Sequence, residues 1–195
     1  MAPRVRPRSD TAGNLPAIGL FREHADVSVR PAIAQDEAAI TRLQLRAWRA
    51  SHTDVLGAET LENLDVTAVR DQWAAAISAP PSRAHRVLVA CDGPRVVGFA
   101  ASAPVDSEGV EVLALEVDPD HQRGGHGSRL LTACVDLARQ EGARSLATWV
   151  LEGDEVRERF LAASGLGPDG GRRQLAIGPA GEDRSVVENR WIAQI

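Results

Sequence analysis

One segment in the second half of the chain combines a strand, a proline, a glycine-rich turn and a helix. An apolar run ends at Val117, Pro119 follows, and the chain turns through Gly124, Gly125 and Gly127 into a helical pattern. Such a turn directs several backbone N–H groups toward one point at the positive end of the helix dipole. Glycine has no Cβ, so a diphosphate can approach the backbone closely. The segment therefore predicts an α/β fold that carries a phosphate-binding turn.

Two common phosphate-binding motifs do not fit this turn. The dinucleotide fingerprint G-x-G-x-x-G, read from Gly125, reaches Leu130 where its third glycine should stand. The P-loop needs a lysine, and the chain contains none. The segment instead matches Gln/Arg-x-x-Gly-x-Gly/Ala, with Gln122, Gly125 and Gly127 at the defined positions.

The composition is that of one ordinary globular domain. The chain has 195 residues, of which 44% are hydrophobic and 25% charged. We expect residues 27–195 to form this domain and residues 1–26, which contain arginine and proline, to be a disordered arm. The net charge of −5 provides no general attraction to nucleic acid, and no apolar run approaches the roughly 20 residues that span a bilayer. We therefore expect neither a nucleic acid nor a membrane as partner, and a homodimer stays open.

Two features of residue usage point to the source and compartment. Lysine and tyrosine are both absent, and because their codons are AT-rich, this indicates a GC-rich and bacterial genome. Cys91 and Cys134 lie far apart within apolar segments, as reduced core thiols do in a cytoplasmic protein. No spacing of histidine and cysteine indicates a metal site.

Hydrophobic periodicity predicts a mixed α/β order along the chain. The expected helices are at residues 35–49, 66–77, from the glycine turn to before 142, and 154–163. The expected strands are at residues 27–30, 86–91, 96–102, 110–117, 145–150, 174–177 and 185–192. The resulting order, β-α-α-β-β-β-α-β-α-β-β, describes one domain.

With these elements in place, the chain resembles the GNAT superfamily of N-acetyltransferases. The resemblance follows the element order from residue 27 to the C-terminus and is strongest over residues 111–166. The residues that match the second half of the family pattern are Leu146, Val150, Phe160 and Gly165. The departures from it are Thr148, Asp154, Arg157, Leu161 and Leu166, with Leu161 in place of the usual tyrosine.

The resemblance implies a single GNAT-like domain with a mixed, mostly antiparallel sheet, a splayed parallel central strand pair and flanking helices. The splay would leave backbone groups unpaired, and the pantetheine arm of coenzyme A would satisfy them. The implied cofactor is acetyl-CoA, with no metal. The residues implied in binding it are Leu115, Val117, Gln122, Arg123, Gly124, Gly125, His126, Gly127, Ser128, Arg129, Asp154 and Phe160. Helix capping is the alternative for Asp154, and a solvated surface charge is the alternative for Arg123 and Arg129.

Transfer to an amine needs a base, because an alkyl ammonium ion cannot attack a thioester. Glu111 is the first candidate, since the strand from Glu111 to Val117 resembles that of the histone-acetylating branch of the family, where glutamate is the base. Simple alternation places Glu111 on one face with Leu115 and Val117, and the second candidate, Glu116, on the other. An exposed position at the start of the strand is the alternative for Glu111.

The general acid is not evident from the sequence. Family members often protonate the leaving thiolate with a tyrosine, and Leu161 cannot do so. The thiolate can leave unassisted, because thiols are acidic (about 8.5 for cysteine); Ser164 or His126 is a weak candidate for a proton shuttle. Trp48 and His52 are expected near the acceptor, with core packing the alternative for Trp48.

The sequence therefore favours an acetyl-CoA-dependent N-acetyltransferase. It would transfer the acetyl group directly from the thioester to a primary amine of a small molecule, peptide or protein, with a glutamate assisting deprotonation. The alternative, raised by Leu161, is a non-catalytic acyl-CoA-binding or regulatory domain on the same scaffold. No residue identifies the amine.

Overall fold

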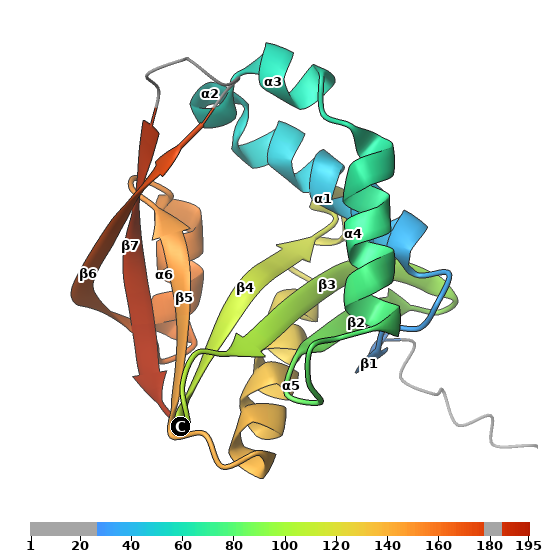
Figure 1. The fold of residues 1–195 in the computed structure, drawn as a ribbon. Helices are drawn as coiled ribbons and strands as arrows, with labels where there is room; N and C mark the ends of the chain where they lie inside the picture. The colour runs from blue at the N-terminus through green and yellow to red at the C-terminus, as the bar shows by residue number, and fades with distance from the viewer. Residues whose placement is uncertain (1–26, 178–184) are drawn as a thin grey trace, which may run out of the picture.

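A seven-stranded sheet runs through the domain in the order β1-β2-β3-β4-β5-β7-β6 (Figure 1). The computed structural model describes residues 27–177 and 185–195, so the arm expected at residues 1–26 lies outside the described residues. The strands are β1 (Val27–Pro31), β2 (Arg86–Asp92), β3 (Arg95–Pro104), β4 (Gly109–Val117), β5 (Ser145–Leu151), β6 (Gly167–Ala176) and β7 (Ser185–Gln194). Neighbours pair antiparallel except β4 and β5, which are parallel. This confirms the predicted fold class.

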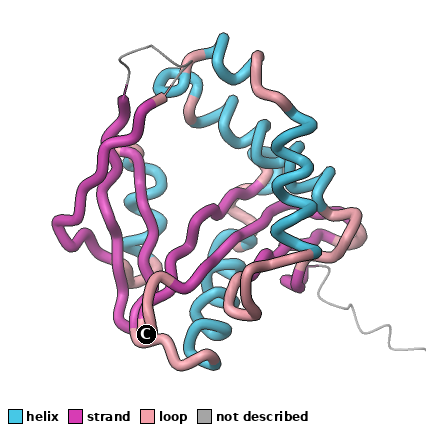
Figure 2. Tube along the Cα trace, in the orientation of Figure 1, coloured by secondary structure: helices cyan, strands magenta, loops and turns pink. Residues whose placement is uncertain are grey.

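Helices cover both faces of the sheet (Figures 1 and 2). They are α1 (Glu37–Ser51), α2 (Thr53–Leu56), α3 (Ala58–Glu62), α4 (Val66–Ser78), the short 3-10 turn η1 (Pro119–His121), α5 (His126–Gln140) and α6 (Glu155–Ala163). The prediction missed α2 and α3, because helices of 4 and 5 residues are too short to show a period. It also began β6 too late, because the first half of β6 is glycine, proline and charged residues without apolar alternation.

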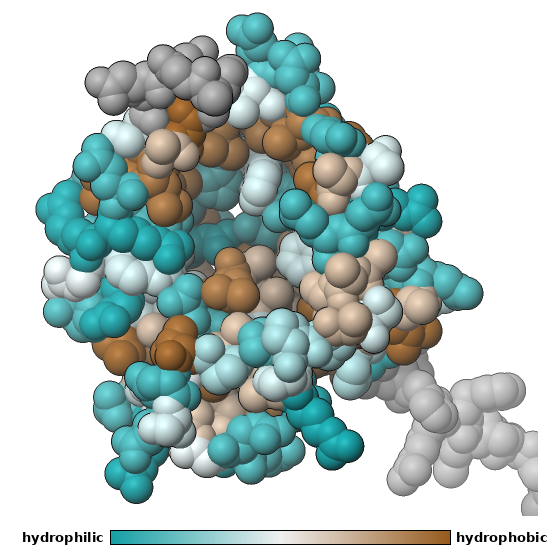
Figure 3. Space-filling model, viewed as in Figure 1, coloured by the Kyte–Doolittle hydropathy of each residue, from teal (hydrophilic) through white to brown (hydrophobic). Residues whose placement is uncertain are grey.

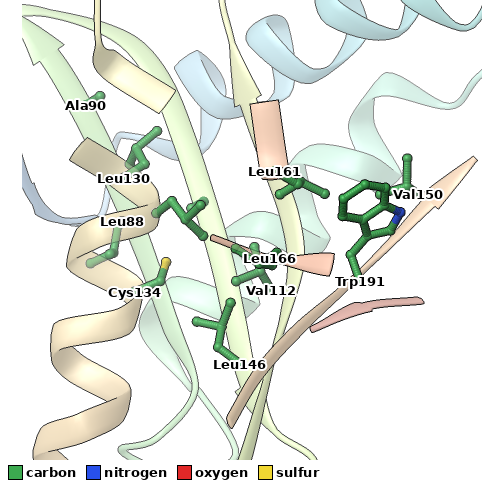
Figure 4. Close-up of a cluster of buried hydrophobic side chains, with 12 residues drawn as sticks. Leu88, Ala90, Val112, Leu130, Cys134, Leu146, Val150, Leu161, Leu166 and Trp191 are labelled. Carbon is green, nitrogen blue, oxygen red and sulfur yellow. The ribbon is translucent and has the colours of Figure 1, made fainter. Parts of the chain in front are cut away.

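Each face of the sheet has its own hydrophobic cluster. Apolar residues of α5 and α6 pack on one face, here called the α5 face, around Leu130, Val112 and Leu161 (Figure 4). Residues of α1 and α4 pack on the other, the α1 face, around Ile40 and Phe99. A sheet covered on both sides holds its strands in a fixed register, because a slip would move apolar side chains to the wrong face.

The parallel strands β4 and β5 separate partway along their length, as predicted. They pair from Gly109 and Ser145 as far as Val112 and Thr148; β4 then continues beside β3 and β5 beside β7. The buried Thr148 Oγ1 donates a hydrogen bond to the Val112 carbonyl at 2.9 Å where the strands part. We call this opening the fork; Figure 1 shows it widening away from the C-terminus.

A bulge in β4 overturns the predicted alternation of its side chains. Ala101 of β3 pairs with Ala114, but the next residue, Ser102, pairs with Val112, so Leu113 is an extra residue. An inserted residue shifts the two-residue period by one and exchanges the faces beyond it. Glu111 therefore shares the α1 face with Glu116, and not with Leu115 or Val117, which contact the α5-face cluster.

Candidate active site

The glycine-rich turn presents a row of free backbone donors. Arg123 (φ 65°) and Gly125 (φ 78°) both adopt left-handed conformations, and α5 begins at the next residue, His126. Within the described residues, no protein group accepts a hydrogen bond from the backbone N–H groups of residues 123–128. These donors lie at the N-terminus of a 15-residue helix, where an anion is stabilised by both the N–H groups and the helix dipole. The turn therefore fits the diphosphate of a cofactor.

Two exposed arginine side chains make hydrogen bonds that hold this turn and the loop before it. Arg129 Nη1 donates to the Gly124 carbonyl at 2.9 Å. Arg46 of α1 bonds Asp118 Oδ2 at 2.7 Å and Asp120 Oδ2 at 2.8 Å, in the loop that leads into the turn. The hydrogen bond from Arg46 to Asp120, together with the positive charge of Arg46, holds the pKa of Asp120 below its usual range. Arg46 could not be predicted from the sequence, because its partners lie more than 70 positions away.

Three further residues predicted to bind the cofactor are Phe160, His126 and Asp154, and the structure shows what surrounds each of them. A Cβ atom at Gly127 would lie 3.6 Å from the Phe160 ring and 3.7 Å from Val117 Cγ2, so Phe160 packs over the start of α5. His126 is buried beside the turn, and its Nδ1 has no partner among the described residues; burial lowers its pKa. Asp154 caps α6 by accepting the Arg157 N–H at 3.0 Å, which is the structural alternative that the sequence left open.

Glu111 lies at the fork on the α1 face and has two partners. Its Oε2 accepts a hydrogen bond from Trp149 Nε1 of β5 at 3.0 Å, across the fork. Its Oε1 lies 4.0 Å from Arg173 Nη1 of β6, and its side chain is 16% exposed. Arg173 also stacks on the Trp149 ring at 4.4 Å and bonds Glu188 of β7 at 2.6 Å. Glu111 is thus held in place by residues of β5 and β6 while remaining accessible.

Glu116 lies further along β4 and is ion-paired more closely. Its Oε1 accepts from Arg157 Nη2 of α6 at 3.0 Å. Arg157 also lies 3.7 Å from Asp154, so one guanidinium joins two carboxylates at the open end of the fork. Oε1 of Glu116 is thus already occupied by a hydrogen-bond donor of the protein.

The remaining predicted residues divide between the fork and its surroundings. His52, between α1 and α2, is only 9% exposed, and burial lowers its pKa; after burial, the charges with the largest effect on its pKa are those of Glu116 and Arg157. Trp48 is only partly buried, so it is not the core residue that its helical stripe favoured. Ser164 Oγ donates to the Phe160 carbonyl at 2.8 Å. Leu161 is 3% exposed and packs with Val150 and Trp191 in the α5-face cluster (Figure 4).

The structure therefore brings the two glutamates and His52 to one side of the fork and the glycine-rich turn to its outer end. The space-filling view is hollowed at its centre, between the β5–β7 strands and the helices of the α1 face (Figure 3). Sequence reasoning missed Trp149, Arg173 and Glu188, because strand pairing alone brings the first two to Glu111 and the third to Arg173.

The described residues include neither a candidate metal site nor a candidate membrane-spanning helix. They contain no group of three or more His, Cys, Asp or Glu side chains that would hold a metal ion. None of the described helices combines the length and apolar character of a membrane span.

Comparison with known proteins identifies relatives of this chain. The model of the acetyltransferase (GNAT) family matches residues 39–166. The uncharacterized N-acetyltransferase YuaI of Bacillus subtilis (strain 168) is 30% identical over 132 residues, which cover 65% of this chain and 72% of YuaI.

Solved structures share the fold at lower sequence identity. The PaiA N-acetyltransferase of Thermoplasma acidophilum, solved in complex with coenzyme A, superimposes with a TM-score of 0.71 at 13% identity, covering 87% of this chain and 99% of PaiA. YncA of Salmonella typhimurium, described as a putative acetyltransferase with its cofactor acetyl-CoA, has a TM-score of 0.62 at 20% identity, covering 87% of this chain and 94% of YncA.

Proposed function

This chain belongs to the acetyltransferase (GNAT) family, and we propose that it transfers an acetyl group from acetyl-CoA directly to a primary amine of a small molecule or peptide. Bound acetyl-CoA would supply the thioester carbonyl that the amine attacks. The free N–H groups of residues 123–128 would hold its diphosphate. Backbone groups of Leu115 and Val117, on the part of β4 that has left β5, would bind the pantetheine arm.

The position of Glu111 carries the proposal. Its carboxylate lies at the fork, with Oε2 held by the Trp149 indole N–H at 3.0 Å and Oε1 at 4.0 Å from Arg173. Oε1 thus makes no close hydrogen bond with any described residue and would accept the proton of the incoming ammonium, directly or through a water molecule. Glu116 is the second candidate, because Arg157 already donates a hydrogen bond to its Oε1 at 3.0 Å.

The leaving thiolate has no protein acid of the usual kind at this site. Leu161 lies within the α5-face cluster, and the Ser164 hydroxyl donates its hydrogen to the Phe160 carbonyl. We propose that the thiolate leaves without a protein acid and takes its proton from water, because a thiol is a fair leaving group.

The same position of Leu161 favours a second candidate function, a non-catalytic domain that binds acyl-CoA. Both candidates require binding of coenzyme A, so binding does not distinguish them. The two candidates are distinguished by the release of free thiol from acetyl-CoA, measured with a panel of primary amines. Binding without thiol release for any amine would support the non-catalytic domain.

Replacing Glu111 tests its proposed role. Glu111→Gln should lower kcat by about 10²- to 10⁴-fold, as expected for loss of a general base. It should also abolish the rise of kcat with pH that reports deprotonation of the base. The dissociation constant for acetyl-CoA should be unchanged, because Glu111 lies away from the turn.

Glu152→Gln is the matched control, because the Glu152 side chain is exposed and, among the described residues, its carboxylate bonds Arg172, at 2.7 Å. It should behave as the unaltered protein. An unchanged kcat and pH–rate profile in Glu111→Gln would remove Glu111 from the mechanism.

A further inference from the structure

Negative charge exceeds positive charge around the fork. We call the charged residues there the rim cluster; it consists of Glu111, Glu116, Asp154, Glu188, Arg157 and Arg173. Arg157 is shared by Glu116 and Asp154, at 3.0 and 3.7 Å, and Arg173 by Glu188 and Glu111, at 2.6 and 4.0 Å. Each guanidinium therefore neutralises only one of the two carboxylates it joins.

A neighbouring arginine does not remove this excess. Arg190 lies 6.0 Å from the Trp149 ring centre, but it bonds Asp169 at 2.6 Å. That pair is neutral as a whole. The carboxylates of the rim cluster thus outnumber its guanidinium groups by two.

The buried His52 adds a free hydrogen-bond acceptor beside this cluster. The Ser51 hydroxyl donates its one hydrogen to the Ala47 carbonyl at 2.7 Å. Its oxygen must therefore accept from His52 Nδ1–H, 2.8 Å away. The proton of the neutral ring is then on Nδ1, and Nε2 carries a lone pair.

No described residue bonds Nε2, and this atom is not buried. Among the described residues, the buried side-chain nitrogens without a partner belong to Arg86, His121 and His126. Nε2 of His52 also has no partner, so it must reach accessible space. The charges that face His52 are Glu116 of β4, Arg157 and Asp154 of α6, and Glu188 of β7, which places this space at the rim cluster.

We propose that the acceptor is a dication: a primary amine that carries a second positively charged nitrogen and no carboxylate. The inference rests on the proposed function, because it names the substrate class of the same site. Glu111 would receive the proton of the reacting amine. Glu116, Glu188 and the Nε2 lone pair of His52 would accept hydrogen bonds from the second cationic nitrogen, which has several N–H donors and matches a surface of acceptors.

An amine that carries a carboxylate does not match this site. Its negative charge would add to an existing excess in a partly buried position, where like charges repel strongly. A neutral alkyl chain would leave the carboxylates and Nε2 without the donors that the second cation supplies.

Three amines of the same carbon number test the proposal. Putrescine, butylamine and γ-aminobutyrate differ only in whether the far end is cationic, neutral or anionic. Their dissociation constants are measured by calorimetry on the full chain, with and without saturating coenzyme A. Putrescine should bind at least about tenfold more tightly than butylamine, a difference of about 1.4 kcal/mol, and γ-aminobutyrate should bind most weakly. Equal or tighter binding of butylamine or γ-aminobutyrate would overturn the proposal.

Two variants connect this preference to the residues. Glu188→Gln removes one carboxylate, and His52→Asn keeps an N–H for Ser51 Oγ but removes the Nε2 lone pair. Each should reduce the ratio of putrescine to butylamine affinity by about threefold or more, and Glu152→Gln should leave it unchanged. The two variants lie in different elements, so a folding defect in one does not imply a defect in the other. If one variant has a lowered Tm, the other variant still tests the proposal. An unchanged ratio in a folded variant would count against the proposal.

The outcome separates this inference from the proposed function. If γ-aminobutyrate or butylamine is acetylated in preference to putrescine, the proposed function holds and the dication is wrong. If no amine releases thiol while the order of binding holds, the proposed catalysis is wrong and recognition of the dication stands.

Discussion

At the residue scale, a few side chains join parts of the molecule that are distant in sequence. Trp149 connects β5 to Glu111 of β4, and Arg157 connects α6 to Glu116 of the same strand. Arg46 connects α1 to the loop before the glycine-rich turn. Hydrogen bonds to charged groups are stronger than neutral ones. These contacts therefore fix where the glutamates and the turn lie relative to one another.

The buried imidazole of His52 makes the stability of the fold depend on pH. Burial lowers the pKa of His52 below its ordinary value of 6.5, so the unfolded chain binds a proton at a higher pH than the folded protein does. The stabilisation is complete above about pH 6.5 and is lost as the pH falls below that value. The free energy of unfolding, measured with urea, should therefore be smaller at about pH 5.5 than at about pH 7.5.

His52→Asn should reduce this difference, because asparagine does not titrate. Burial lowers the pKa of His126 as well, so part of the dependence should remain until both histidines are replaced. The same dependence on pH in His52→Asn as in the unaltered protein would show that His52 does not contribute.

At the element scale, short irregular segments create the site within regular strands and helices. The extra residue Leu113 turns Glu111 and Glu116 to the same face of β4. Arg123 and Gly125, which adopt left-handed conformations, lie in the turn between β4 and α5 and align the first N–H groups of α5. One inserted residue and one turn therefore decide which face of β4 carries both glutamates and where the free N–H groups gather.

The backbone of Gly125 provides a test of the turn. Its φ of 78° strains any other residue, and an added Cβ atom would lie 3.0 Å from Arg129 Nη1. Gly125→Val should raise the dissociation constant for coenzyme A at least about tenfold, or about 1.4 kcal/mol, as measured by calorimetry. Gly142→Val, at the other end of α5, is the control, because its φ of 88° causes the same strain and nothing lies within 4 Å of the added atom. Equal affinities for the two variants would place the diphosphate elsewhere.

At the scale of the whole molecule, the fork divides one sheet into two diverging halves. The β1–β4 half is packed between α5 on one face and α1 and α4 on the other, while β5–β7 continue beside α6 (Figure 1). The halves are joined by the short parallel pairing that ends at Val112 and Thr148. The width of the fork therefore depends on the place where that pairing stops.

Thr148 provides a test of this junction. Thr148→Val removes the buried hydrogen bond to the Val112 carbonyl and should lower the free energy of unfolding by about 1 kcal/mol. Thr41→Val is the control. Thr41 is also buried, but its Oγ1 donates to the carbonyl of Glu37, one turn earlier in the same helix, so its loss should cost less. Urea unfolding measures the free energy of unfolding of both variants. Equal decreases would show that the hydrogen bond at the fork stabilises the protein no more than the bond within the helix.

The sequence alone determined the strands, the longer helices and the glycine-rich turn. These features depend on local periodicity, or on a motif whose residues are close together, such as Gln122, Gly125 and Gly127. Tertiary structure decided what surrounds Glu111. The bulge at Leu113 follows from the register against β3. Trp149 and Arg173 reach Glu111 only through strand pairing, and Glu188 reaches Arg173 in the same way. Spacing along the chain does not encode these contacts, because a sheet brings together residues according to the order of its strands.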